Sequence, residues 1–221
     1  MFSSERLPMA QAYAAWLAEA GTLRGLLGPR EVSRLWERHL LNCAVLAELL
    51  EPDATVCDLG SGAGLPGLVL AIARPDLRVT LVEPLLRRTT FLEEVVADLG
   101  LTSVEVLRGR AEDLPGDRRF DAVTSRALAP LDRLLGWSMP LVAPTGALVA
   151  MKGASVGAEI ASARPVLTGL GCAEPVIVEL GSDVLRTPAT VVRVAWAEPG
   201  RVGWPLAPVA VARSPRARRK R

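Results

Sequence analysis

Short apolar runs alternate with longer segments of helical periodicity through most of this chain. The runs are rich in Val, Leu and Ala, as buried strands are, and the segments between them place apolar residues three or four positions apart, on one helix face. The predicted strands span residues 55–60, 78–83, 103–108, 120–125 and 146–152, and the predicted helices span residues 65–74, 85–99, 130–142 and 155–171. This alternation predicts a parallel sheet with helices on both faces.

Both ends of the chain depart from this alternation. An apolar stripe from Val32 to Leu50 predicts one long amphipathic helix, preceded by a helix over residues 9–20. Near the other end, the apolar runs 175–181 and 189–196 lie too close together for a helical crossover, so they predict an antiparallel hairpin. The predicted fold is therefore α/β and Rossmann-like. It has a seven-stranded, mostly parallel sheet that ends in an antiparallel hairpin, and an N-terminal helical extension.

This pattern divides the chain into a helical extension (residues 1–50), a sheet domain (51–198) and a basic, disordered tail (199–221). The last nine residues, RSPRARRKR, hold six of the 26 basic residues and none of the 24 acidic ones. The remainder has 20 basic and 24 acidic residues, so the net charge of +2 comes from the tail. Such a tail either contacts nucleic acid electrostatically or is a solvated end that aids solubility, and both interpretations stay open.

The overall composition is that of an ordinary globular protein, with 50% hydrophobic and 23% charged residues in 221. The N-terminus has no signal-peptide pattern, and prolines and glycines interrupt the longest uncharged run, residues 134–151. We therefore expect a cytoplasmic protein without a membrane span. The three cysteines are far apart and there is one histidine, so we expect reduced thiols and no metal site.

The most informative stretch is TVCDLGSGAGLPG, residues 55–67, where a glycine-rich turn joins a predicted strand to a predicted helix. Glycines let the backbone approach a ligand closely, and the helix N-terminus presents free N–H groups. Such a turn can hold a dinucleotide, a phosphate or the methionine end of S-adenosylmethionine. Its candidate cofactor-binding residues are Asp58, Gly60, Gly62 and Gly64.

Glu83 ends the next predicted strand, where an acidic side chain accepts hydrogen bonds from a ribose diol in an NAD site and in an S-adenosylmethionine site alike. Three other features favour methyl transfer. The terminal hairpin is not expected in the six-stranded dinucleotide fold, the D-L-G-S-G form of the turn is typical of methyltransferases, and the chain leaves little room for a separate substrate domain. The alternatives are an NAD(P)-dependent oxidoreductase with a Rossmann fold and a non-enzymatic RNA- or nucleotide-binding module.

Five segments carry a more specific resemblance. In chain order they are R-H-L-L-N (residues 38–42), D-L-G-S-G-A-G-L-P-G (58–67), R-A-E (110–112), F-D-A-V-T-S-R-A (120–127) and A-M-K-G (150–153). Together they resemble the bacterial 16S rRNA guanine-N7 methyltransferases of the RsmG (GidB) type, over about residues 30–196. The chain departs from that pattern at Asn42, where the family usually has aspartate.

The resemblance implies a class I methyltransferase fold and an S-adenosylmethionine site. Gly60 and Leu65 would lie against the cofactor in the first turn, Ala111 and Glu112 would meet its adenosine, and Arg126 would complete the pocket. It also implies the partner: 16S rRNA, in the 30S subunit or in an assembly intermediate. Guanine N7 already presents an unprotonated lone pair, so no general base is expected and positioning supplies much of the catalysis.

Three further side chains are candidates for positioning the substrate. Arg126 and Lys152 end adjacent predicted strands, at the edge where doubly wound folds bind ligands. Lys152 is one of two lysines beside 24 arginines, and we expect its ammonium to contact RNA phosphate or guanine O6, with a solvated strand end as the alternative. His39 lies on the apolar stripe, as a core histidine or a residue that lines the active site. Trp36, on the same stripe, is expected in the core.

Overall fold

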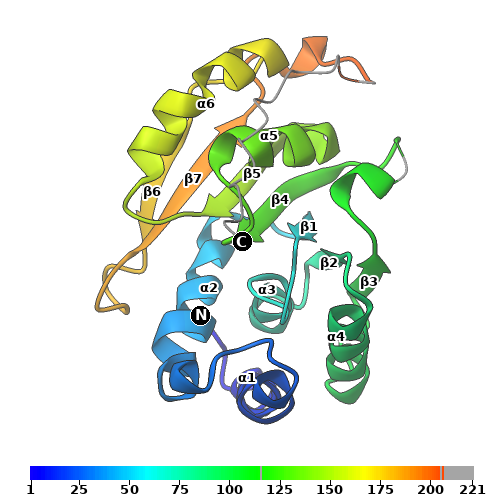
Figure 1. The fold of residues 1–221 in the computed structure, drawn as a ribbon, viewed down its shortest axis with the longest axis vertical. Coiled ribbons are helices and arrows are strands. Elements are labelled where there is room, and N and C mark those ends of the chain that lie inside the picture. The colour runs from blue at the N-terminus through cyan, green and yellow to red at the C-terminus, as the bar shows by residue number, and fades with distance from the viewer. Residues whose placement is uncertain (115, 205, 207–221) are drawn as a thin grey trace, which may run out of the picture.

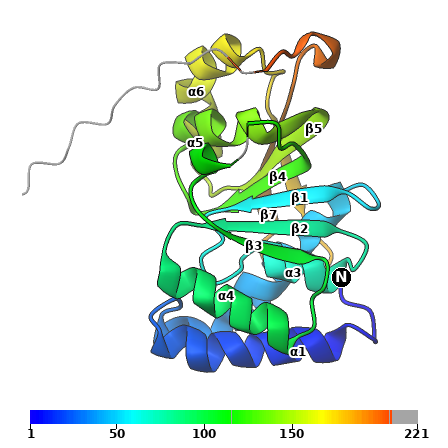
Figure 2. The ribbon, with the colours of Figure 1, turned by 90° about the vertical axis from the view of Figure 1, so that its right-hand side faces the viewer.

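The computed structural model describes residues 1–114, 116–204 and 206, and its centre is one sheet of seven strands (Figure 1, Figure 2). The strands are β1 (Thr55–Leu59), β2 (Arg78–Glu83), β3 (Val104–Arg108), β4 (Phe120–Arg126), β5 (Val142–Met151), β6 (Val176–Leu180) and β7 (Ala189–Ala195). They lie in the order β3-β2-β1-β4-β5-β7-β6. In this sheet β7 alone runs opposite to the other strands, and it pairs antiparallel with β5 and β6. The predicted fold, with its terminal hairpin, is therefore confirmed.

Helices cover both faces of the sheet. They are α1 (Leu7–Trp16), α2 (Asn42–Ala44), α3 (Gly67–Ala73), α4 (Leu86–Asp98), α5 (Leu131–Ser138) and α6 (Val156–Leu170). Successive strand residues point to opposite faces, so Val56 packs with α3, α4 and the N-terminal helices, whereas Cys57 packs with α5 and α6. Figure 2 shows the two helical layers on either side of the strands. The central strands β1, β2 and β4 are buried on both faces, and their apolar runs are nearly continuous for that reason.

The N-terminal extension is helical but less regular than its periodicity predicts. Instead of one long helix, the chain forms a 3-10 segment (Pro29–Arg34), a π-helical segment (Leu35–Leu41), α2 and a second 3-10 segment (Val45–Leu49). Arg34, at φ −116° and ψ 9°, interrupts the helical dihedrals. The spacing of apolar residues shows which helix face is buried, but it does not determine whether the backbone hydrogen bonds follow the α, 3-10 or π pattern.

Trp36 differs from the sequence prediction in its burial. Its side chain is exposed, and its one contact among the described aromatic pairs is a T-shaped one with Phe2, at 6.4 Å between ring centroids. The expectation that Trp36 lies in the core is therefore wrong.

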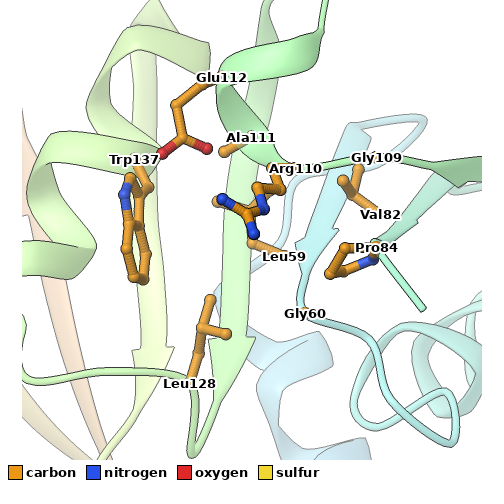
Figure 3. A pocket seen from close by; sticks show the side chains of 10 residues that line it. All are labelled: Leu59, Gly60, Val82, Pro84, Gly109, Arg110, Ala111, Glu112, Leu128 and Trp137. Carbon is orange, nitrogen blue, oxygen red and sulfur yellow. The ribbon is translucent and has the colours of Figure 1, made fainter.

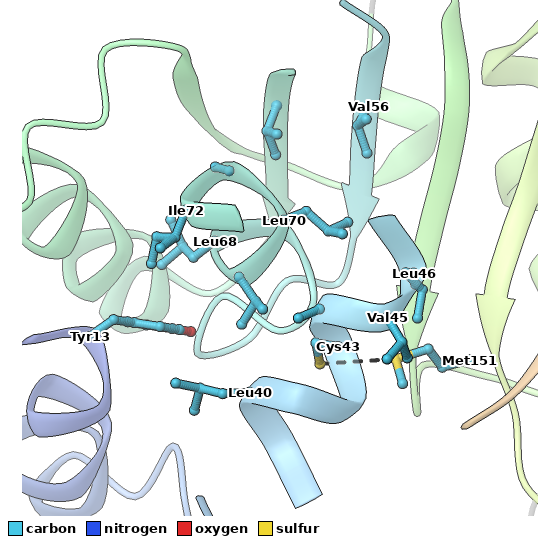
Figure 4. Close-up of a cluster of buried hydrophobic side chains, with 14 of the residues drawn as sticks. Tyr13, Leu40, Cys43, Val45, Leu46, Val56, Leu68, Leu70, Ile72 and Met151 are labelled. Atoms are coloured by element: carbon cyan, nitrogen blue, oxygen red, sulfur yellow. Dashed lines mark hydrogen bonds between the residues drawn. The ribbon is translucent and has the colours of Figure 1, made fainter. Parts of the chain in front are cut away.

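The extension packs directly behind the glycine-rich turn (Figure 4). Tyr13 is fully buried, and its hydroxyl donates a 2.7 Å hydrogen bond to the carbonyl of Ala63 within the turn. Cys43 is also fully buried, with its sulfur 4.0 Å from that of Met151 at the end of β5. The N-terminal helices therefore support both the turn and the neighbouring strand end from one side.

The chain beyond residue 198 begins with a short 3-10 turn (Pro199–Arg201). The ring of Trp204 then packs edge-on against Trp196 at 6.0 Å, and its Nε1 donates to the Pro140 carbonyl. The rest of the predicted tail, residues 205 and 207–221, lies outside the described residues. Within the described ranges, no helix is long and apolar enough to cross a membrane.

Candidate active site

The turn between β1 and α3 has a backbone that only glycine adopts without strain. Gly60, Gly62 and Gly64 have φ values of +69°, +60° and +97°, in the left-handed region that L side chains rarely enter. A Cβ on Gly60 would lie 2.5 Å from Leu128 Cδ1, and a Cβ on Gly64 would lie 2.9 Å from the Tyr13 hydroxyl. The turn is therefore held close to its neighbours on both sides.

Asp58 lies one residue before the end of β1 and is fully buried. Its Oδ2 accepts a 3.0 Å hydrogen bond from the Gly67 N–H, and burial raises the pKa of the carboxyl to about 7. Its Oδ1 is buried and has no hydrogen-bond partner among the described residues. Buried polar atoms are normally satisfied, so this oxygen suits a donor from a ligand or from water.

Glu83 ends β2 and is also buried. Its Oε2 accepts from the Gly62 N–H at 3.1 Å and from Arg88 at 3.3 Å, and its Oε1 accepts from the Leu85 N–H at 3.0 Å. The carboxylate thus joins the glycine turn to the start of α4. A carboxylate has about four acceptor positions, so these bonds leave capacity for a ribose hydroxyl.

Beside the turn lies a cavity of about 220 Å³ whose lining is mostly apolar. Its walls are Leu59, Gly60, Val82, Pro84, Gly109, Arg110, Ala111, Glu112, Leu128 and Trp137. Figure 3 shows the side chains of Arg110, Glu112 and Leu128 facing the Trp137 indole across the cavity. The structure therefore brings together the predicted residues Gly60, Ala111 and Glu112, and it adds Leu128 and Trp137, for which the sequence carries no signal.

A second, more polar hollow of about 760 Å³ adjoins it, at the carboxyl ends of β4 and β5. The loop after β4, the end of β5, the start of α6 and the loop before β7 supply most of its lining, including Arg126, Lys152 and Glu159. Leu128 lines both hollows, so the two adjoin at this residue. Ala127, just before it, has a φ of +52°, which places a strained residue at the boundary.

Arg126 projects from the end of β4 toward the N-terminal extension. Its Nη2 donates to His39 Nδ1 at 2.6 Å and to the Arg38 carbonyl at 3.4 Å, and its Nη1 donates to Cys43 Sγ at 3.4 Å. His39 Nε2 in turn lies 2.9 Å from Glu31 Oε2. The structure therefore joins two predicted residues, Arg126 and His39, and adds Glu31, which no motif marks.

Lys152 is not the solvated strand end of the alternative interpretation, because 8% of its side chain is exposed. Its ammonium donates to the Ala129 carbonyl and to Glu159 Oε2, each at 2.8 Å. The same Glu159 oxygen accepts from the Leu131 N–H at 3.0 Å, and this pairing lowers the pKa of Glu159 despite its burial. Lys152 thus connects the end of β5, the loop after β4 and α6.

Six predicted residues line neither hollow, namely Asp58, Gly62, Gly64, Leu65, Glu83 and His39. Leu65 packs partly buried against the core that includes the N-terminal helices. Gly62 and Gly64 shape the turn but line neither hollow. Within the described ranges, no cluster of three or more His, Cys, Asp and Glu side chains could hold a metal ion.

The family of rRNA small subunit methyltransferase G (GidB) has a sequence model that matches residues 6–183. The chain belongs to this family. The protein named ribosomal RNA small subunit methyltransferase G in a Nocardioides species is 68% identical over 94% of this chain and 83% of its own length. That of Mycobacterium marinum is 57% identical, over 85% of this chain and 83% of its own length.

Solved structures of other methyltransferases share the fold at low sequence identity. The tRNA methyltransferase TrmK of B. subtilis superposes with a TM-score of 0.53 and 18% identity, over 74% of this chain and 67% of that one. A precorrin-6y methyltransferase of Geobacter metallireducens gives 0.50 and 14%, over 78% and 91%. The fold of this family member is thus the class I methyltransferase fold.

Proposed function

We propose that this chain transfers the methyl group of S-adenosylmethionine to N7 of one guanine in small-subunit (16S) ribosomal RNA. The observation that carries the proposal is a mostly apolar cavity beside a glycine turn, adjoining a polar cleft at Leu128, in a member of this family. The first hollow suits a nucleoside cofactor and the second suits a substrate base. Neither alternative, an NAD(P)-dependent oxidoreductase or a non-enzymatic RNA-binding module, is favoured by this family.

The residues around the first hollow fit S-adenosylmethionine. The turn at Gly60, Gly62 and Gly64 allows close backbone approach, the free Oδ1 of Asp58 can accept a hydrogen bond, and Glu83 retains acceptor capacity for a ribose. Ala111 and Glu112 would line the adenosine end. Leu65 and Arg126 belong to the proposed cofactor set by resemblance. When bound, the cofactor supplies a methyl group activated on a sulfonium.

The protein's own contribution is positioning. Arg126 and Lys152 border the polar cleft, each held by hydrogen bonds to neighbouring groups, so the cleft walls are ordered before a substrate arrives. Guanine N7 attacks through its own lone pair, so no side chain has to remove a proton first. An in-line displacement then depends on how well the base and the methyl group are aligned.

A direct assay tests this proposal. The full-length chain is incubated with methyl-labelled S-adenosylmethionine and either 30S subunits or deproteinised 16S rRNA from cells lacking the gene, and nucleosides are identified by mass spectrometry. We expect 7-methylguanosine with at least one of the two, and the comparison indicates whether naked rRNA or an assembled particle is the substrate. Gly60→Val should abolish the product, whereas Gly100→Val is the matched control, since Gly100 also has a positive φ but has nothing within 4 Å.

Failure to methylate either substrate, or methylation at another atom, would refute the proposal. Titration with S-adenosylhomocysteine and with NADH separates the alternatives, because selective NADH binding would favour an oxidoreductase.

We also propose that residues 51–198 form the methyltransferase domain, with residues 1–50 as an extension that supports it. A chain with this substrate would work in the cytoplasm, where ribosomal subunits are assembled.

A further inference from the structure

A short chain of polar side chains runs from the surface of the N-terminal extension to the substrate cleft. Glu31 lies on the 3-10 segment Pro29–Arg34, His39 lies on the π-helical segment that follows, and Arg126 ends β4. The imidazole of His39 stands between the other two, 2.9 Å from Glu31 Oε2 and 2.6 Å from Arg126 Nη2. His39 is 6% exposed, so water does not easily replace Glu31 or Arg126 as its hydrogen-bond partner.

The chemistry of the two neighbours determines the state of the imidazole. A guanidinium has only donors, so the ring nitrogen that faces Arg126, Nδ1, must act as an acceptor and carry no proton. An ionised carboxylate has only acceptors, so Nε2 must carry the proton that Glu31 accepts. Only the neutral ring with its proton on Nε2 satisfies both contacts.

We propose that His39 is a positioning residue whose neutral imidazole, with its proton on Nε2 donated to Glu31, accepts a hydrogen bond at Nδ1 from Arg126 and holds that guanidinium at the rim of the cleft. The inference rests on the proposed function, since the cleft beside Arg126 is where we place the guanine. The three bonds from Arg126 to His39, Cys43 and the Arg38 carbonyl use at most three of its five N–H donors. Donors therefore remain for a ligand in the cleft.

The surroundings of His39 favour the required neutral form. Burial lowers the pKa of His39 below its usual value of 6.5, and the positive charges of Arg126 and, on its own segment, Arg38 act in the same direction. Glu31, from the preceding segment, opposes them through its hydrogen bond and charge. Protonation of the ring would turn Nδ1 into a donor facing the donors of Arg126. Acid should therefore release the guanidinium from its position.

His39 is the only histidine in the sequence, so its signals need no assignment. Long-range 1H–15N correlation spectra of the uniformly 15N-labelled full-length chain at pH 7.5 should show a pyrrole-type Nε2 and a pyridine-type Nδ1. A pH titration should give a pKa below 6.5, and Arg126→Met should raise it. A proton on Nδ1, or a doubly protonated ring at pH 7.5, would overturn the proposal whether or not the protein methylates RNA.

Two matched variants test the functional consequence. Asparagine places an amide near the position of Nδ1, whereas glutamine reaches the position of Nε2. We expect His39→Asn to keep most of kcat/KM and His39→Gln to lose about tenfold to a hundredfold, the cost of misplacing a positioning group by about 1 Å. The wild type should also lose activity as the pH falls through the pKa of His39, and His39→Asn should lack this limb. If both variants lose the same factor in kcat/KM while keeping wild-type melting temperatures, the proposal is wrong and His39 contributes only to packing.

Discussion

Gly64→Ala should destabilise the protein far more than the same substitution at Gly100. Both residues have a positive φ, +97° and +61°, so each substitution incurs about 1–2 kcal/mol of backbone strain. The gain from a less flexible unfolded chain is also common to both variants and cancels in the comparison. The two sites differ in packing, because a Cβ at Gly100 meets nothing within 4 Å.

A Cβ at Gly64 would lie inside 3 Å of Leu68 and of the Tyr13 hydroxyl, and both side chains are fully buried. Neither neighbour can move into solvent, so crowding should add about 1–3 kcal/mol. Strain and crowding together should therefore lower the free energy of unfolding of Gly64→Ala by about 2–5 kcal/mol, against which the gain from the less flexible unfolded chain is smaller. That is a large part of the roughly 5–15 kcal/mol that stabilises a typical domain.

Urea denaturation of the two variants measures this difference. With a slope of about 2 kcal/mol per molar urea, an extra 2 kcal/mol lowers the midpoint of Gly64→Ala by about 1 M relative to Gly100→Ala. Calorimetric titration with S-adenosylhomocysteine should show weaker binding to Gly64→Ala alone, because only Gly64 belongs to the turn. Equal urea midpoints would refute the argument that the N-terminal helix holds the turn from behind.

Three further predictions concern polar groups around the site. Tyr13→Phe removes the hydrogen bond to the Ala63 carbonyl and leaves that acceptor buried, so it should cost about 1–3 kcal/mol in urea denaturation and weaken cofactor binding. Lys152→Met leaves the Glu159 carboxylate without its cation and should cost about 3 kcal/mol, whereas adding Glu159→Gln should cost less than the sum of the single changes. Burial raises the pKa of Asp58 from 3.8 to about 7, so the carboxyl is ionised in the unfolded chain and protonated in the folded one between these pH values. The free energy of unfolding should therefore fall as the pH rises from 3.8 to 7. In Asp58→Asn, unfolding measured across this pH range should lack that decrease.

The order and type of the main elements could be predicted from the sequence because they depend on short-range patterns. The central parallel strands β1, β2 and β4 are buried on both faces, so their apolar runs are nearly continuous, and each flanking helix repeats its apolar face every three or four residues. The predicted strand boundaries lie within a few residues of those in the structure. The largest difference is at β5, which starts at Val142 and not at residue 146. The single long helix predicted from Val32 to Leu50 was wrong in its continuity, since periodicity does not encode the hydrogen-bond ladder.

The candidate site, too, has features that the sequence predicts and features that depend on tertiary packing. The glycine turn and Glu83 were visible in the sequence because they combine a special backbone with a fixed place at a strand end. The partners of Arg126 and Lys152 were not, since a charged side chain bonds to whichever group the packing places in reach. His39 reaches Arg126 across 87 positions of sequence, and Leu128 lines both hollows because the loop after β4 brings it against Gly60. By itself the sequence determined the fold and the location of the turn; the tertiary structure decided which polar groups pair, because hydrogen bonds are satisfied in space and not along the chain.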